Sequence, residues 1–281
     1  MEQLISNVIE RLSHVYPGSS ITCQIIQKNN GIKMHGIAIM KPGEKIAPTI
    51  YIDKMYEDGL SVDDIIDYII DGCENGPGSP DWTANISNYD TVKDLLTLRL
   101  VNYELNKNML GFDGDKTPYI KHKDLAIIVK IALFESNGET STKVTNDMLK
   151  MWGKGFEEVY SVAKQHFKEE KTVITKLFDL LPSKMQTPEV EHLPMYILSN
   201  ERNLNGSVRM LDEDALRKFA DAIDSDLIIL PSSIHEVILC PDYLEVDANE
   251  LRNIVKMANA TCVDPQEVLS DSVYYFKRNE E

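Results

Sequence analysis

The sequence has few cysteines, and none of them lies near another. The four among its 281 residues, Cys23, Cys73, Cys240 and Cys262, form no C-x-x-C pair. That pair is the spacing that zinc ribbons and redox motifs use. Cys23 and Cys240 lie inside apolar strings, where a free cysteine acts as a small hydrophobic residue. We therefore expect four reduced thiols.

Long hydrophobic runs are also missing. No apolar stretch approaches the roughly 20 residues that a membrane-spanning helix needs. The N-terminal stretch MEQLISNVIERLSHVYPG carries Glu2 and Glu10 and is typical of an amphipathic helix. An export signal would instead have a basic start followed by an apolar core. We therefore expect a cytoplasmic protein.

Basic residues are outnumbered, with 29 lysines and arginines against 45 acidic residues and a net charge of −16. Nucleic-acid binding rests on basic patches that neutralise phosphates, and this chain offers only short basic pieces such as Lys121–Lys123. Anionic membrane surfaces repel an acidic protein for the same reason. We expect neither nucleic acid nor a membrane as a partner, and we interpret the acidity as a means of staying in solution.

Several sequence motifs that hold cofactors are absent. There is no P-loop and no G-x-G-x-x-G stretch, the usual cradles for nucleotide phosphates. The six histidines form no H-x-x-x-H or H-E-x-x-H spacing, so metalloprotease chemistry has no anchor. We expect no cofactor.

What the sequence does contain is a recurring strand–turn–strand–helix pattern. Asn-Gly between apolar runs is the strongest local signal for a tight β-turn, and it occurs at Asn30-Gly31, Asn137-Gly138 and Asn205-Gly206. A fourth strand pair, LIILP and EVILC, surrounds the polar residues Ser232–Glu236. The pattern predicts an α+β fold of antiparallel sheets with helices packed on them.

Each strand pair is followed by a helix with its own start signal. Ser61 and Asp64 have capping-box spacing, as have Asp247 and Glu250, and Asp212 is an expected N-cap. Apolar residues at helical spacing in FEEVYSVAKQHF predict another helix. Further helices are expected at Glu2–His14 and Val92–Met109, outside the pattern. The last strand, SDSVYYF, should place Tyr274 and Tyr275 on opposite faces.

Two stretches interrupt the regular elements. Pro182–Pro194 is polar, holds three prolines and has no periodicity, while Asn75–Trp82 ends one helix and cannot begin another before Pro80. The first is the better linker, so we divide the chain into an N-terminal region, 1–187, and a C-terminal region, 188–281. The two regions can also form one continuous fold.

The first candidate for chemistry is the turn PSSIHE. Ser232 or Ser233, His235 and Glu236 supply the residue types of an acyl-transfer site. Neighbouring strand residues point to opposite faces, so His235 and Glu236 cannot both converge on one serine, and no G-x-S-x-G elbow is present. The alternative is that the serine hydroxyls bind turn amides while His235 lies at a strand end.

Carboxylates provide two further candidates. Asp113, Asp115, Thr117 and Asp124 fall at positions 1, 3, 5 and 12 of a calcium-loop template, but Pro118 replaces its glycine and an aspartate its final glutamate. The helix face carrying Asp64, Asp67, Asp71 and Glu74 is either a docking or divalent-ion stripe or a solvated surface. For both stretches the simpler interpretation is carboxylates exposed to water.

Several strings together resemble an uncharacterised bacterial family. They are LPMYILSNERNLNGSVRML, SDLIILPSSIHEVILCP and EVLSDSVYYF, with APTIYIDKMY and DMLKMWG in support. The resemblance implies a bacterial cytoplasmic protein and brings no activity or catalytic set. Our leading hypothesis is therefore a non-enzymatic interaction or regulatory module with a protein partner. The alternatives are a small hydrolase using Ser233 and His235, and a sensor of a small ligand or divalent ion.

Overall fold

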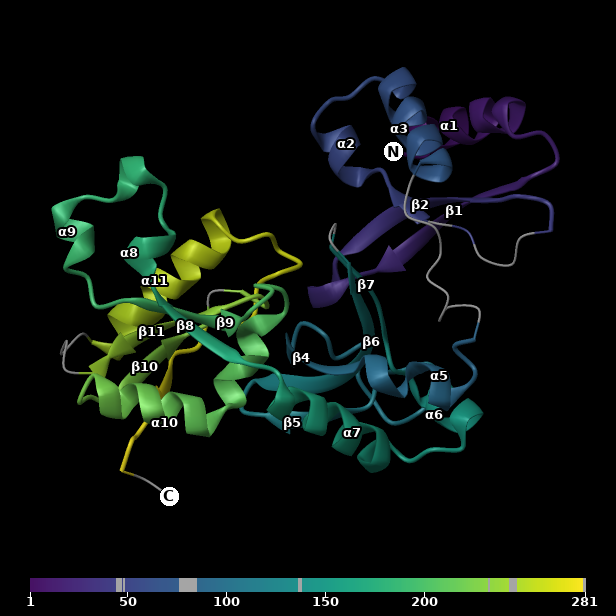
Figure 1. The fold of residues 1–281 in the computed structure, drawn as a ribbon. Coiled ribbons are helices and arrows are strands. Elements are labelled where there is room, and N and C mark those ends of the chain that lie inside the picture. Colours follow the sequence, from purple (N-terminus) through teal and green to yellow (C-terminus); the bar gives the residue numbers. More distant parts are fainter. Residues whose placement is uncertain are drawn as a thin grey trace. The chain divides into compact units, whose positions relative to one another are not determined.

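The computed structural model describes residues 1–43, 47, 49–75, 85–135, 138–231, 233–242 and 247–279. The chain divides into two compact units, Met1–Ile86 and Ser87–Glu281 (Figure 1). No helix in the described ranges is long and apolar enough to cross a membrane.

The first unit is a three-stranded antiparallel sheet with helices packed on it. Its elements are α1 (Glu2–Val15), β1 (Ser20–Gln27), η1 (Asn29–Gly31), β2 (Lys33–Met40), β3 (Thr49–Tyr51), α2 (Asp53–Glu57) and α3 (Val62–Glu74). The strands lie in the order β1-β2-β3. Val8 and Leu12 of α1, Ile37 and Ile39 of β2, and Ile65 of α3 share one buried core.

Local signals in this unit act as the sequence predicts. Asn30 and Gly31 both have positive φ, 58° and 73°, and the hairpin they form pairs β1 with β2 from Gln27↔Lys33 outwards. Ser61 caps α3 in a capping box with Asp64. Both predictions are confirmed.

The second unit contains two antiparallel sheets. In the first, the long strand β6 (Leu125–Glu135) pairs with β4 (Leu96–Asn102), with β5 (Tyr119–His122) and with β7 (Gly138–Lys143). Around it lie α5 (Tyr89–Val92), η2 (Lys93–Leu95), α6 (Asn146–Trp152) and α7 (Phe156–Glu169). Helix α7 packs against β4 and β6.

The second sheet has five strands in the order β12-β10-β11-β9-β8. The strands are β8 (Thr172–Lys176), β9 (Tyr196–Asn200), β10 (Leu227–Leu230), β11 (Val237–Pro241) and β12 (Tyr274–Phe276). The helices are α8 (Leu177–Leu180), η3 (Ser183–Met185), α9 (Pro188–Glu191), η4 (Gly206–Leu211), α10 (Glu213–Ala222) and α11 (Ala248–Thr261). Leu251 and Val255 of α11 pack on Ile228 and Leu230 of β10.

The predicted α+β class with antiparallel sheets is confirmed. β10 pairs with β11 from Leu227↔Pro241 to Leu230↔Ile238, so the polar residues between them do reverse the chain. β6 and β7 form the second predicted hairpin, although Asn137 itself lies outside the described residues. Tyr274 is 4% exposed and Tyr275 is 41% exposed, as expected for opposite faces of the last strand.

Two element predictions are wrong. Val92–Met109 is not one helix, because Leu96, Leu98 and Leu100 alternate with polar residues and are buried on strand β4; sheet pairing overrides the helix propensity of leucine. Asn205-Gly206 does not form a hairpin either. Asn205 has the predicted positive φ of 53°, but the chain then continues into η4 and not into a strand. The strands that pair with β9 are β8 and β11.

The expected division after residue 187 falls inside the second unit. It lies between β8 and β9, which pair from Thr172↔Asn200 to Lys176↔Tyr196. The other expected break, Asn75–Trp82, lies outside the described residues except for Asn75. The division between the compact units, at Ile86 and Ser87, follows shortly after that second stretch.

Candidate functional site

The predicted serine site is a turn whose hydroxyl group serves the backbone. Ser232 lies outside the described residues. Ser233 is buried, and its Oγ accepts hydrogen bonds from the backbone N–H groups of His235 (3.0 Å) and Glu236 (3.4 Å). This is the arrangement expected when a serine stabilises a turn.

The His235 ring is engaged with groups other than Ser233. Its Nδ1 accepts a hydrogen bond from the backbone N–H of Asn205 at 3.1 Å, and its Nε2 lies 3.3 Å from Glu267 Oε1. Burial raises the pKa of Glu236, and the nearby Glu267 raises it further. The contacts of Ser233 and His235 therefore support the turn interpretation and give no support to acyl transfer.

The calcium-loop candidates are occupied in separate contacts. Asp113 pairs with Lys116 at 3.3 Å, and Asp115 is exposed on the same turn. Asp124 accepts hydrogen bonds from the hydroxyl groups of Ser270, Ser272 and Tyr274. Within the described ranges, no group of three or more His, Cys, Asp or Glu residues could hold a metal ion.

The acidic face of α3 consists largely of groups that serve the unit itself. Asp64 completes the cap with Ser61. Asp71 accepts a hydrogen bond from the Asn75 side chain at 2.8 Å, and Glu74 accepts one from the Tyr16 hydroxyl at 3.3 Å. The contacts of these three carboxylates lie within the first unit and give no support to a docking or ion-binding stripe.

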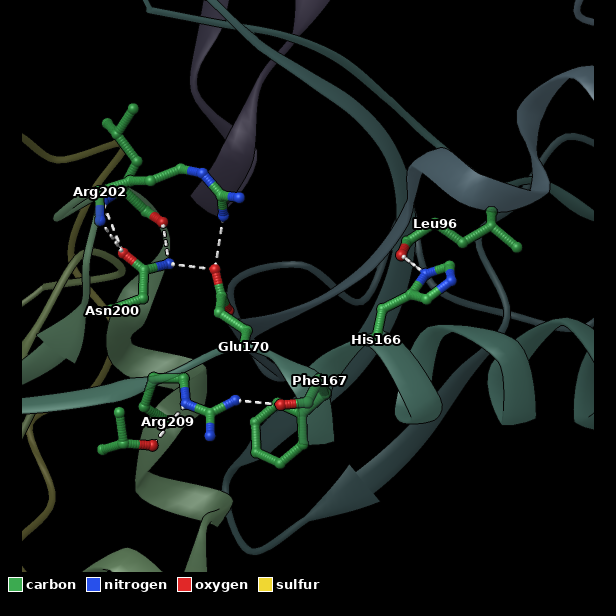
Figure 2. Close-up of polar contacts among 9 residues, drawn as sticks. Leu96, His166, Phe167, Glu170, Asn200, Arg202 and Arg209 are labelled. Atoms are coloured by element: carbon green, nitrogen blue, oxygen red, sulfur yellow. Dashed lines mark hydrogen bonds and ion pairs between the residues drawn. The ribbon is translucent and has the colours of Figure 1, made fainter.

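A more promising site lies at the C-terminal end of α7. Two cavities of about 330 and 430 Å³ share His166, Glu170 and Arg202 in their linings. These volumes are at the small end of those that ligand pockets have. His166 and Glu170 are four residues apart and so belong to the same side of the helix end. Figure 2 shows the polar contacts of the three side chains. We call the two cavities together the α7-end cavity.

Glu170 is held by two donors, Asn200 at the end of β9 and Arg202 in the loop that follows it. Its Oε1 accepts hydrogen bonds from Arg202 Nη1 at 2.6 Å and from Asn200 Nδ2 at 3.2 Å (Figure 2). Asn200 is buried, and its Oδ1 accepts from the backbone N–H groups of Arg202 and Leu204. Asn200 thus fixes both the carboxylate and the loop that carries the guanidinium.

His166, which lines both cavities, has its ring held by a backbone contact. Its Nδ1 lies 2.8 Å from the carbonyl oxygen of Leu96 (Figure 2). A carbonyl oxygen only accepts, so Nδ1 carries the proton and donates it. In the neutral ring, Nε2 is therefore the acceptor. This backbone contact also fixes the orientation of the ring.

The α7-end cavity is acidic. Its lining contains four carboxylates, Asp94, Glu169, Glu170 and Glu201, against two cations, Lys171 and Arg202. Arg202 pairs with Glu170, and Lys171 pairs with Glu201 at 3.6 Å. Four negative and two positive charges leave an excess of two negative charges. The electrostatics favour a cationic ligand group over an anionic one.

A buried arginine makes the cavity wall rigid. Arg209 is 1% exposed and donates to Thr172 Oγ1 (2.7 Å), to the Phe167 carbonyl oxygen (2.5 Å) and to Asp212 Oδ2 (2.6 Å). Its guanidinium also stacks on the Phe167 ring, 3.9 Å from the centroid. Figure 2 shows the Phe167 contact. Arg209 lies on η4, Phe167 on α7 and Thr172 on β8. This one side chain therefore connects the end of α7 to η4 and to β8.

Sequence reasoning missed the α7-end cavity, although it left signals. His166 and Glu170 stand at i, i+4 near a predicted helix end. Lys130 is the single charge inside the apolar run LAIIVKIALF; it is 5% exposed and lines a small space with Glu170 and Asn200. A buried charge needs polar partners, so Lys130 pointed to a polar cluster beside this strand.

The fold and the cavity define an α+β protein with a small acidic cavity between two antiparallel sheets of its second unit. The chain belongs to DUF5688, a family of unknown function, whose model matches residues 1–278. No curated protein matches the chain, and no solved structure matches it. The predicted membership of a family of unknown function is confirmed.

Proposed function

We propose that this chain is a non-enzymatic interaction module that binds a basic segment of a protein partner. A lysine or arginine side chain of the partner enters the α7-end cavity. The observation that carries the proposal is the excess of two negative charges in its lining.

The lining suits the whole length of a basic side chain. Lysine and arginine bury their aliphatic stems along apolar surface while their charged ends reach polar groups. Leu95, Leu133 and Val208 provide apolar wall in the same cavity as Asp94 and Glu170. Because Asn200 and Leu96 already fix the carboxylate and the imidazole, little ordering remains to be done when the ligand binds.

The charge of the whole chain supports the same class of partner. A net charge of −16 attracts a basic segment from a distance and repels polyanions. The competing hydrolase hypothesis has no comparable support, since Ser233 and His235 bind other groups. A bacterial source and a cytoplasmic location stay predictions from the sequence.

Binding of short basic peptides tests the proposal. Fluorescence anisotropy would compare labelled Gly/Ser peptides that carry central lysines or arginines with the same peptides in which the lysines are acetylated. Acetylation keeps the stem and removes the charge. We expect the charged peptides to bind at least about fivefold more tightly than the acetylated ones. This ratio corresponds to the strongest effect that one exposed ion pair has.

Variants of the lining locate the binding site. Glu170→Gln and Asp94→Asn should each weaken binding of the lysine peptide by about threefold or more. Glu157→Gln, an exposed carboxylate at the start of the same helix, is the matched control and should leave binding unchanged. Equal binding of charged and acetylated peptides, or equal effects of the lining and control variants, would show that the proposal is wrong.

A further inference from the structure

A second cavity, of about 390 Å³, lies against a different face of α7. Tyr160 and Lys164 line it, His166 and Glu170 line the α7-end cavity, and Phe167 lines both. The opposite wall comes from the β5–β6 turn and from β12, through Lys123 and Tyr275. All of its lining residues belong to the second unit.

Five aromatic residues are among those that line this second cavity, although Tyr274 and Tyr275 lie on opposite faces of β12. Tyr160, Phe167, Tyr274, Tyr275 and Phe276 all line it. The Tyr274 ring is held in place, because its hydroxyl group donates a hydrogen bond to Asp124 Oδ1 at 2.7 Å. Fixed aromatic walls favour a planar ligand group, which stacks on them or meets them edge to face.

Its charge is opposite to that of the α7-end cavity. Lys123 and Lys164 are exposed at its lining, and Glu213 is the acidic lining residue. Burial lowers the pKa of His122, and Lys123 lowers it further, so the imidazole adds no positive charge near neutral pH. Two cations against one carboxylate leave a net positive charge in a chain whose total is −16.

Lys123 also occupies an unusual backbone position. Its φ is +56°, in a region that favours glycine or asparagine. The other non-glycine residues with positive φ in the described part of the chain are Asn or Asp. The Lys123 ammonium lies 4.9 Å from the centroid of the Tyr274 ring. The turn therefore holds a lysine beside an aromatic wall where its backbone geometry favours other residues.

We propose that this second cavity binds a small aromatic anion, a planar ring that carries one carboxylate or phosphate group. The aromatic walls take the ring, and Lys123 and Lys164 take the anionic group. The site adjoins the α7-end cavity, with which it shares Leu98 and Phe167, and on this proposal the two cavities take ligands of opposite charge. This gives the proposed interaction module a place for a small-molecule effector.

Isothermal titration calorimetry of the full chain with 1-naphthyl phosphate tests the proposal, with 1-naphthol and inorganic phosphate as the separate halves of the probe. We expect 1-naphthyl phosphate to bind at least about tenfold more tightly than either half, because it combines ring burial with ion pairing. Affinity should fall with added salt, because the two lysines are exposed. Binding no tighter than that of 1-naphthol, or no binding at millimolar concentration, would overturn the proposal.

Charge variants distinguish binding in this cavity from nonspecific attraction of the anionic probe to surface lysines. Lys123→Gln and Lys164→Gln should each weaken binding of 1-naphthyl phosphate about threefold or more, and Glu213→Gln should strengthen it. Lys168→Gln, one turn further along α7 and outside the lining, is the matched control. A loss that is as large for Lys168→Gln, or no change at any lining residue, would refute the assignment. A melting temperature for each variant confirms that it is folded.

Discussion

At the scale of single residues, Asp124 was a candidate calcium ligand in the sequence. In the structure, its carboxylate stabilises the fold as a hydrogen-bond acceptor. It lies in the turn between β5 and β6 and accepts from Ser270, Ser272 and Tyr274, which are some 150 positions further along the chain. Burial by itself raises the pKa of Asp124, but the hydrogen bonds from Ser270, Tyr274 and Ser272 outweigh it, so the net shift is downward. The ionised form is therefore stabilised in the folded state.

Replacing Asp124 by asparagine should destabilise the protein in a pH-dependent way. A group whose pKa is lowered on folding stabilises the protein at pH values above its pKa in the unfolded state, about 3.9. This contribution is lost as the pH falls through the pKa in the folded state. We expect Asp124→Asn to cost about 2 kcal/mol of unfolding free energy at pH 7. Urea titrations at several pH values between 7 and 3 should show this difference shrinking below about pH 4.

Asp115→Asn is the control for this measurement, because Asp115 is exposed on the turn after β4. Its effect should stay within about 0.5 kcal/mol. A constant difference between wild type and Asp124→Asn over the whole pH range would contradict the charged-acceptor interpretation of Asp124.

At the scale of elements, η4 explains why Asn205-Gly206 signals a hairpin and forms none. The backbone of η4 passes close to β9 and to the turn before β11. A Cβ atom on Gly206 would lie 2.1 Å from Ser199 Oγ, 2.6 Å from Asn200 N and 2.8 Å from the His235 carbonyl oxygen. A residue without a side chain is needed here because the backbones approach so closely. The glycine of Asn205-Gly206 therefore serves packing and does not form a hairpin turn.

Gly206→Ala should therefore destabilise the second unit strongly. Two of the three close atoms belong to the backbone and cannot move by themselves, so we expect a loss of about 3 kcal/mol, at the upper end for overpacking. Chemical denaturation measures it. Gly155→Ala, where nothing lies within 4 Å of the added Cβ, should change stability by less than about 1 kcal/mol. Similar losses for both variants would show that Gly206 is not packed as described.

At the scale of the whole molecule, the two units have separate cores. The core formed by α1, β2 and α3 lies entirely within the first unit. In the second unit, β8 and β9 are consecutive strands of one sheet. A division after residue 187 would separate these two paired strands, whereas the division between Ile86 and Ser87 keeps them together.

Fragments test this division directly. We expect 87–281 expressed alone to give a dispersed amide spectrum by NMR, because both of its sheets are complete. Residues 188–281 lack β8 and the whole β4–β6 sheet, which leaves one edge of β9 unpaired and open to aggregation. A well-dispersed spectrum from 188–281 together with a collapsed one from 87–281 would favour the division after residue 187.

Features that depend on a few neighbouring residues were predictable from the sequence. The cap at Ser61, the hairpin at Asn30-Gly31, the β10–β11 pair and the α+β class follow from hydrogen bonds, glycine conformations and periodicity within short windows. The failures, Val92–Met109 and Asn205-Gly206, are places where a distant strand decided the outcome of a local preference.

The sequence by itself determined the helix starts at Ser61, Asp212 and Asp247, and it determined that the chain carries a large negative charge. Only the tertiary structure decided which polar groups meet. The α7-end cavity joins Asp94, His166, Glu170 and Arg202 from segments far apart in the chain, and their proximity depends on strand order and helix packing. Ser233 and His235 are close in sequence, yet backbone direction sends their polar atoms to different partners. Spacing along a strand sets which face each side chain takes, but it does not set which distant segment lies opposite that face, and this is why the tertiary structure is needed.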